Sequence, residues 1–152
     1  VWGGAAGCMP ALIGWAAVTN SLSITAWSFF LVIFFWTPPH FWALAIKYKD
    51  DYAAANIPML PVVASKSHLL RQMWVYTVAM IASSVALIFN AELQNWAMVV
   101  TVLLGLVFAV QLRDLDEKSD SYEKAAGKIF QWSISYLSLF SVVLVVAQLL
   151  KA

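Results

Sequence analysis

The residues best suited to chemistry lie in one stretch, from Pro38 to Asp51, which reads PPHFWALAIKYKDD. Asp50 and Asp51 form an adjacent carboxylate pair, and Lys47 and Lys49 precede them. Mg²⁺ prefers oxygen ligands and typically takes one or two carboxylates together with phosphate oxygens of a substrate. Lysines can balance the remaining negative charge of the phosphate. The stretch therefore indicates a Mg²⁺–phosphate site, although the spacing also fits a solvated helix end with local ion pairs.

His40 is the second candidate, because an ionisable side chain inside an apolar helix is costly and is by default a functional hypothesis. Its imidazole could contact a metal, donate to a buried anion or take up a proton. It could equally be a neutral histidine bonded to a carbonyl that the two preceding prolines release. If the helix continued to Asp51, then His40, Lys47 and Asp51 would share one face. Trp36 would lie close to the same stripe.

These side chains must be positioned by membrane helices, because the composition does not suit a water-soluble domain. Hydrophobic residues make up 62% of the 152 residues and charged residues only 11%, whereas soluble domains are about a quarter charged. Charged residues are absent from residues 1–46, 72–91, 93–112 and 129–150. About 20 helical residues cross a bilayer, so the first of these stretches holds two crossings.

The fold class that follows is all-α, a polytopic membrane bundle that forms a single membrane domain over residues 1–152. The five predicted spans are residues 3–18, 24–46, 71–89, 96–111 and 128–150. Gly3, Gly7 and Gly14 give the first span a small face on which another helix could pack closely.

Basic residues alternate between the connecting segments and predict the orientation. The 47–71 and 113–128 loops are basic, whereas the 90–95 turn has no Lys or Arg. By the positive-inside rule, we predict that both basic loops are cytoplasmic and that the C-terminus is outside. The acidic segment RDLDEKSDSYEK, which spans Arg113 to Lys124, is predicted to be a solvated linker.

The stretch FFWTPPHFWALAIKYKDDYAAANIPMLPVV, from Phe34 to Val63, closely resembles the signature of the protoheme IX farnesyltransferases. These heme O synthases form a branch of the UbiA-type intramembrane prenyltransferases. The segments GGAAGCMPALIGWAAVT and KIFQWSISYLSLF are similar to the helix that precedes the signature and to the final helix of that family. The resemblance covers essentially the whole chain.

The resemblance implies a nine-span bundle around a central cavity, of which this chain is similar to the last five spans. It implies transfer of a farnesyl group from farnesyl diphosphate to a vinyl group of heme b, giving heme o for terminal oxidases. It also implies Mg²⁺ bound with the diphosphate, residence in the cell inner membrane, and terminal oxidase assembly or heme a synthase partners. The lipid bilayer is the remaining partner, and nothing in the sequence suggests nucleic acid.

The same resemblance implies roles for particular residues. Asp50 and Asp51 would be the catalytic acids that hold Mg²⁺, and Lys47 and Lys49 would bind the diphosphate. The heme or substrate pocket would include three side chains of the second span, which are His40, Trp42 and Trp36.

Two departures from the family pattern matter. The family's first Asp-rich segment has no counterpart here, so the chain is expected to begin inside a longer protein and to be inactive alone. Asn56 stands where the family usually has Gly, and Asn is the next most tolerant residue for a left-handed turn.

Three other functions remain open from the residues. The first is a prenyltransferase with an aromatic quinone precursor as acceptor, although PPHFW favours heme. The second is a transporter that uses the His–Lys–Asp stripe as a polar path, and the third is a membrane subunit without catalytic activity.

Overall fold

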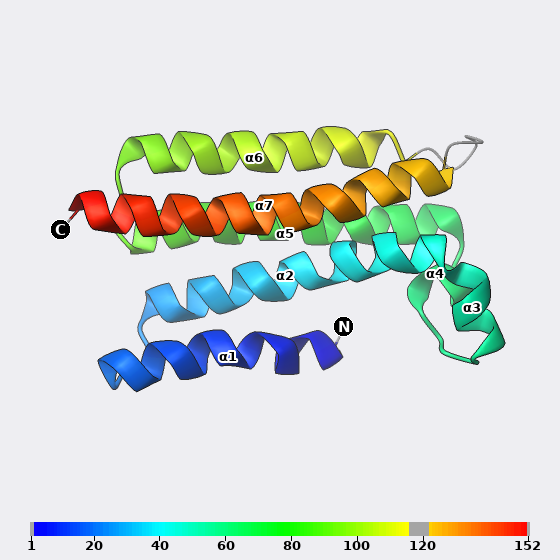
Figure 1. The fold of residues 1–152 in the computed structure, drawn as a ribbon, viewed down its shortest axis with the longest axis horizontal. Helices are drawn as coiled ribbons and strands as arrows, with labels where there is room; N and C mark the ends of the chain where they lie inside the picture. The colour runs from blue at the N-terminus through cyan, green and yellow to red at the C-terminus, as the bar shows by residue number, and fades with distance from the viewer. Residues whose placement is uncertain (1, 116–121, 152) are drawn as a thin grey trace.

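The computed structural model describes residues 2–115 and 122–151, and all the regular elements within these ranges are helices (Figure 1). The elements are α1 (Trp2–Thr19), α2 (Ile24–Lys47), α3 (Lys49–Ala54), α4 (Leu60–Val63), α5 (Lys66–Asn90), α6 (Asn95–Arg113) and α7 (Tyr122–Lys151). The prediction of an all-α bundle is confirmed.

Four helices, α2, α5, α6 and α7, are long and apolar enough to cross a membrane. The first predicted span, α1, is also apolar but is shorter than these four. Helices suit hydrocarbon because each satisfies its own backbone donors and acceptors. The chain is therefore a multi-pass membrane protein.

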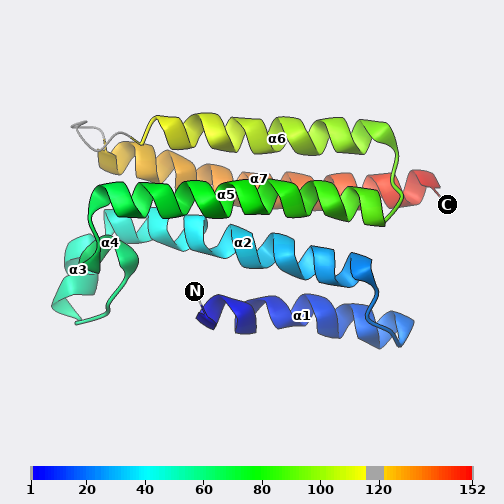
Figure 2. The same cartoon turned by 180° about the vertical axis from the view of Figure 1, so that it is seen from behind.

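The long helices run side by side, with α2 in a central position (Figures 1 and 2). α2 packs against α1, α5 and α7, and α6 packs against α5 and α7. The seam between α5, α6 and α7 is fully buried at Met80, Phe108 and Tyr136. This packing fixes α7 beside α2 and brings residues about 95 positions apart in sequence, such as Trp36 and Ser133, into contact.

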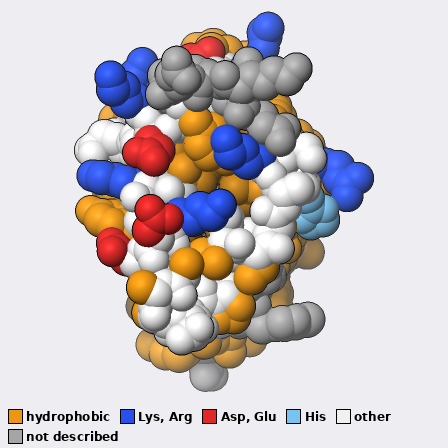
Figure 3. Space-filling model, turned by 90° about the vertical axis from the view of Figure 1, so that its right-hand side faces the viewer, with side chains coloured by type: hydrophobic (Ala, Val, Ile, Leu, Met, Phe, Trp, Pro, Cys, Tyr) orange, Lys and Arg blue, Asp and Glu red, His pale blue; other side chains and the backbone are white. Residues whose placement is uncertain are grey.

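The described parts of the two predicted basic loops lie at the same end of the bundle, to the right in Figure 1. Figure 3 looks onto this end and shows Lys, Arg, Asp and Glu side chains gathered there. The helices that flank these loops extend past the apolar stretches. α5 begins at Lys66, where the Ser65 hydroxyl caps it by accepting from the His68 N–H at 3.3 Å, and α7 begins at Tyr122. Residues 116–121 of the predicted acidic linker lie outside the described residues.

The predicted stripe from His40 to Asp51 is interrupted. α2 ends at Lys47, and Tyr48 has φ −107° and ψ 31°, which is not helical. The chain then enters α3, which turns away from the axis of α2 (Figure 1). Asp51 therefore does not continue the face of α2 that carries His40.

Two local predictions have opposite outcomes. Asn56 adopts φ 55°, so the left-handed turn predicted at this position is confirmed. The prediction that Gly3, Gly7 and Gly14 pack against a helix is wrong for the described residues, since a Cβ at any of them would meet no atom within 4 Å. It is Gly4 that approaches α2, where a Cβ would lie 3.3 Å from the Thr37 methyl.

Candidate functional site

A pocket of about 420 Å³ opens at the charged end of the bundle, where five helices converge. We call it the charged-end pocket. It is lined by Ile46 and Lys47 of α2, Lys49 and Asp50 of α3, Pro61 of α4, Ala64, Lys66 and Leu69 around the start of α5, and Tyr122 and Glu123 of α7. Three of the four sequence-predicted metal and diphosphate residues thus line one cavity.

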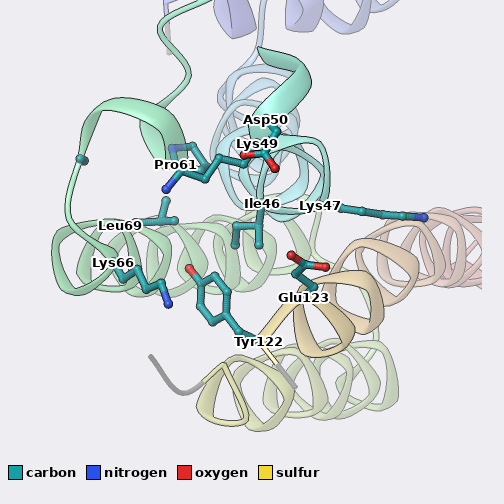
Figure 4. A pocket seen from close by; sticks show the side chains of 10 residues that line it. Ile46, Lys47, Lys49, Asp50, Pro61, Lys66, Leu69, Tyr122 and Glu123 are labelled. Carbon is teal, nitrogen blue, oxygen red and sulfur yellow. The ribbon is translucent and has the colours of Figure 1, made fainter. Parts of the chain in front are cut away.

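The charges of this pocket come from separate elements and face a common space (Figure 4). Lys49 and Asp50 enter from α3, whereas Tyr122 and Glu123 enter from the first turn of α7. The Lys66 ammonium lies 4.7 Å from the centre of the Tyr122 ring. The side chain of Lys47 extends away from Asp50, and its ammonium lies 5.4 Å from the centre of the Tyr48 ring.

Lys47, Lys49 and Asp50 do not form ion pairs with one another within the described part of the chain. No nitrogen of Lys47 or Lys49 lies within 4.0 Å of a carboxylate oxygen there, and the ion pair found in these residues joins Lys151 and Glu92 at 3.6 Å. Lys47, Lys49 and Asp50 are also exposed. Their charges are therefore available to a ligand that carries both phosphate oxygens and a cation.

The break at Tyr48 is what brings Lys49 and Asp50 to the pocket. A straight continuation of α2 would carry them further along the helix axis, but the new direction of α3 places Asp50 on the wall of a cavity that the start of α7 also lines. Asp51 is exposed on α3 and does not line the cavity. The acid doublet is thus divided between the pocket and the surface.

The donor set fits a metal that arrives with its phosphate ligand. In the described residues, no group of three or more His, Cys, Asp or Glu side chains could hold a metal by itself. Mg²⁺ usually uses one or two carboxylates and completes its shell with substrate phosphates and water. Asp50, with Glu123 on the opposite wall, can meet that requirement.

Lys66, Tyr122 and Glu123 also line the charged-end pocket, and none of them was a predicted site residue. Lys66 was visible only as one of several basic residues in a loop, and Tyr122 and Glu123 fell in the segment predicted to be a solvated linker. Tyr122 and Glu123 reach the pocket because α7 packs between α2 and α6, and Lys66 reaches it because α5 packs against α2; no local sequence pattern indicates these contacts.

His40 lies deeper in the bundle, in a cluster of side chains from α2 and α7. Its Nδ1 is 2.7 Å from the Ser133 hydroxyl, and its ring stacks on Trp36 and on Phe130 at centroid distances of 4.3 and 4.8 Å. The Trp36 indole donates to the Ser133 carbonyl at 2.8 Å. The histidine is thus bonded to a hydroxyl on α7, and not to a carbonyl that the prolines release.

The two predicted pocket tryptophans line a second, mostly apolar cavity of about 520 Å³ between α1 and α2. Trp36 and Trp42 share its wall with Phe41 and Met59, whereas His40 does not line it. Trp36 therefore touches both the histidine cluster and this apolar cavity. The arrangement gives a charged mouth at the end of the bundle and apolar, aromatic space further along α2.

Comparison with known proteins gives a consistent result. Residues 1–135 match the UbiA prenyltransferase family. The chain is 46% identical over 151 residues to a protoheme IX farnesyltransferase of Parafrankia sp., covering 99% of this chain and 48% of that relative. It is 43% identical over 150 residues to a protoheme IX farnesyltransferase of Synechocystis sp., covering 98% and 47% respectively.

A third relative, the protoheme IX farnesyltransferase of Frankia alni, is 46% identical over 147 residues, which is 96% of this chain and 51% of that protein. The chain thus spans about half the length of the curated relatives it matches. No solved structure is significantly similar to it.

Proposed function

The chain belongs to the UbiA prenyltransferase family, and from this premise we propose that the full-length protein transfers a farnesyl group from farnesyl diphosphate to a vinyl group of heme b. The product is heme o. The observation that carries the proposal is the charged-end pocket, where Lys49, Lys66 and Asp50 line one cavity, with apolar, aromatic space further along α2. The relatives named protoheme IX farnesyltransferase support heme as the acceptor.

In the proposed reaction, this chain holds the leaving group. The ammonium groups of three lysines, Lys47, Lys49 and Lys66, bind the diphosphate oxygens, because ammonium groups form charge-assisted hydrogen bonds with phosphate. Asp50 supplies a carboxylate for the metal from the wall of the pocket, and Asp51, which is exposed on α3, supplies a second one. Bound Mg²⁺ would stabilise the negative charge that develops on the diphosphate as its bond to the allylic carbon breaks.

The acceptor occupies the apolar part of the site. The vinyl group forms a new carbon–carbon bond to the allylic carbon as the bond to the diphosphate breaks, which leaves a carbocation next to the porphyrin ring. Water adds to this carbocation and loses a proton, giving the hydroxyethylfarnesyl side chain. Trp36 and Trp42 line the apolar cavity that would take the porphyrin or the farnesyl chain, and His40 stacks on Trp36 beside it. Their aromatic faces suit a flat apolar substrate.

The proposed setting is the cell inner membrane. The charged end, with loops 47–71 and 113–128, faces the cytoplasm, and the C-terminus lies outside. Lys, Arg, Asp and Glu side chains gather at this end of the bundle, which supports a single orientation for the two loops (Figure 3). The remaining spans of a nine-helix enzyme would supply the first Asp-rich segment and close the site, and terminal oxidase assembly or heme a synthase partners would receive the product.

Product analysis tests the proposal directly. Full-length protein in nanodiscs is incubated with Mg²⁺, farnesyl diphosphate and either heme b or an aromatic quinone precursor, and the products are identified by mass spectrometry. We expect heme o from heme b and no prenylated quinone precursor. If only the quinone precursor were prenylated, the acceptor would be an aromatic quinone precursor and not heme. If neither compound gave a product, the enzymatic function would be refuted.

A further inference from the structure

The histidine cluster fixes more than the position of His40, because the Ser133 hydroxyl takes part in two contacts with a single proton. Its oxygen is 2.6 Å from the Phe130 carbonyl oxygen and 2.7 Å from His40 Nδ1. A carbonyl oxygen can only accept. The Ser133 proton must therefore go to Phe130, and the bond to His40 forms only if Nδ1–H is the donor.

This hydrogen-bond pattern determines the tautomer of the imidazole. In a neutral ring with the proton on Nδ1, Nε2 carries the lone pair. Nε2 has no hydrogen-bond partner among the residues described, and His40 is half-buried. The lone pair on Nε2 is thus left for something outside this cluster.

The ring is also held against rotation. Trp36 and Phe130 stack on it with interplanar angles of 19° and 26°. Two parallel rings at these distances do not fit on one face, so they lie on opposite faces of the imidazole. Phe41 meets the ring edge-on at 5.2 Å. With both faces and the Nδ1 edge occupied, the ring is preorganised and does not depend on a ligand to order it.

We propose that Ser133 is a positioning residue that holds His40 as the Nδ1–H tautomer, so that Nε2 serves as the imidazole ligand to the iron of the heme substrate. This deepens the proposed function and rests on heme being the acceptor. A second group bonded to the distal nitrogen is what usually orients a metal-binding histidine, and removing such a partner typically lowers metal affinity about 10–100-fold.

The first arm of the test reads the tautomer without any heme. Nitrogen NMR of full-length protein labelled with ¹⁵N-histidine, with His40 assigned from its loss in His40→Gln, distinguishes a protonated Nδ1 from a protonated Nε2. We expect Nδ1–H in the wild type and in Ser133→Thr, which keeps a hydroxyl, and a mixture of tautomers in Ser133→Ala. A protonated Nε2 in the wild type would overturn the proposal.

The second arm titrates ferric heme b into the same proteins and records the iron-ligand bands in the absorption spectrum. His40→Ala should abolish the imidazole signature, and Ser133→Ala should weaken heme binding about tenfold, while Ser133→Thr restores it. Ser141→Ala is the matched control, because Ser141 is exposed on the same helix and donates to a backbone carbonyl at 2.8 Å. Equal losses in Ser133→Ala and Ser141→Ala would mean a general effect on α7 and would overturn the proposal.

The two arms separate this inference from the proposed function. Unchanged heme spectra in His40→Ala would refute iron ligation even if farnesyl transfer to heme proceeds. Absence of heme binding in the wild type would refute the heme acceptor and, with it, the role of Nε2. Trp36→Phe keeps a ring stacked on His40 and loses only the indole hydrogen bond to the Ser133 carbonyl. This variant should therefore retain the Nδ1–H tautomer. Loss of the tautomer in Trp36→Phe would mean that the Ser133 hydroxyl does not determine it.

Discussion

The charged-end pocket and the buried seam between α5, α6 and α7 handle polar groups in opposite ways. In the pocket, Lys49 and Asp50 are exposed and form no ion pair with the other described residues. In the seam, Ser84 and Tyr136 are fully buried and bonded to each other at 2.8 Å. The charged groups of the pocket can therefore bind a ligand, whereas the polar groups of the seam bond to each other and hold the helices together. Substitutions in the pocket should change activity, whereas substitutions in the seam should change stability.

The largest effect is expected at the acid doublet. Asp50→Ala should lower the farnesyl-transfer rate of the full-length protein by at least about a hundredfold, because metal stabilisation of a leaving group is worth several kcal/mol. Asp51→Ala should cost less, since Asp51 does not line the pocket. Both variants should unfold like the wild type. Equal rates in the wild type and in the double variant Asp50→Ala with Asp51→Ala would remove the metal role altogether.

A substitution in the seam should show the reverse pattern. A Cβ on Gly105 would lie 2.8 Å from Ile81 Cγ1, where α5 and α6 approach closely. Gly105→Ala should therefore destabilise the protein by about 1–3 kcal/mol through overpacking. Gly14→Ala is the matched control, because a Cβ there meets open space. Unfolding in mixed micelles measures the stability of both variants. If Gly105→Ala were as stable as the wild type, α5 and α6 would be able to move apart without loss of stability.

The contribution of the pocket lysines should be intermediate. Lys49→Met should weaken binding of farnesyl diphosphate about tenfold, which corresponds to one charge-assisted hydrogen bond. Lys47→Met should have a smaller effect, because its side chain extends away from Asp50 (Figure 4). Equilibrium binding of a non-reactive farnesyl diphosphate analogue checks the order. A larger loss for Lys47→Met would mean that the diphosphate lies on the other side of the end of α2.

The smallest effect, and the finest distinction, is expected within the Ser84–Tyr136 pair. Ser84 donates to the Met80 carbonyl at 2.9 Å, so the Tyr136 hydroxyl must be the donor to Ser84. Ser84→Ala leaves that hydroxyl buried without a partner, whereas Tyr136→Phe leaves Ser84 still bonded to Met80.

Hydrogen bonds between membrane helices average about 0.6 kcal/mol and reach about 1.7. Ser84→Ala should thus destabilise the protein towards the upper value and Tyr136→Phe towards the lower value, with farnesyl transfer unchanged in both. The same unfolding assay measures both losses of stability. A greater loss in Tyr136→Phe than in Ser84→Ala would contradict the assignment of the Tyr136 hydroxyl as the donor.

Sequence reasoning found the architecture because the membrane makes it simple. Gaps in charge of about 20 residues can only be helices in hydrocarbon, so the fold class and four spans were predictable. The helix ends were not, because polar residues at the membrane surface can extend a helix without breaking the pattern. Ser65 starts α5 as a cap, and Tyr122 begins α7 inside a segment that looked like a linker.

The site was predictable in part for a similar reason. Asp50, Lys47 and Lys49 stand out locally as charges after a long apolar helix. The turn at Tyr48, which separates Asp50 from the face of α2, has no glycine or proline to announce it. The contacts of His40 with Ser133 and Phe130 join residues some ninety positions apart, and only helix packing brings them together.

The central claim is that the charged-end pocket binds a metal–diphosphate pair through Asp50. Binding of a non-reactive farnesyl diphosphate analogue to the full-length protein, measured by calorimetry with Mg²⁺ and with a chelator, tests it most directly. We predict tight binding that needs Mg²⁺ in the wild type, and Asp50→Asn binding that no longer responds to Mg²⁺. Binding of equal strength with the chelator, or an unaltered Mg²⁺ response in Asp50→Asn, would contradict it.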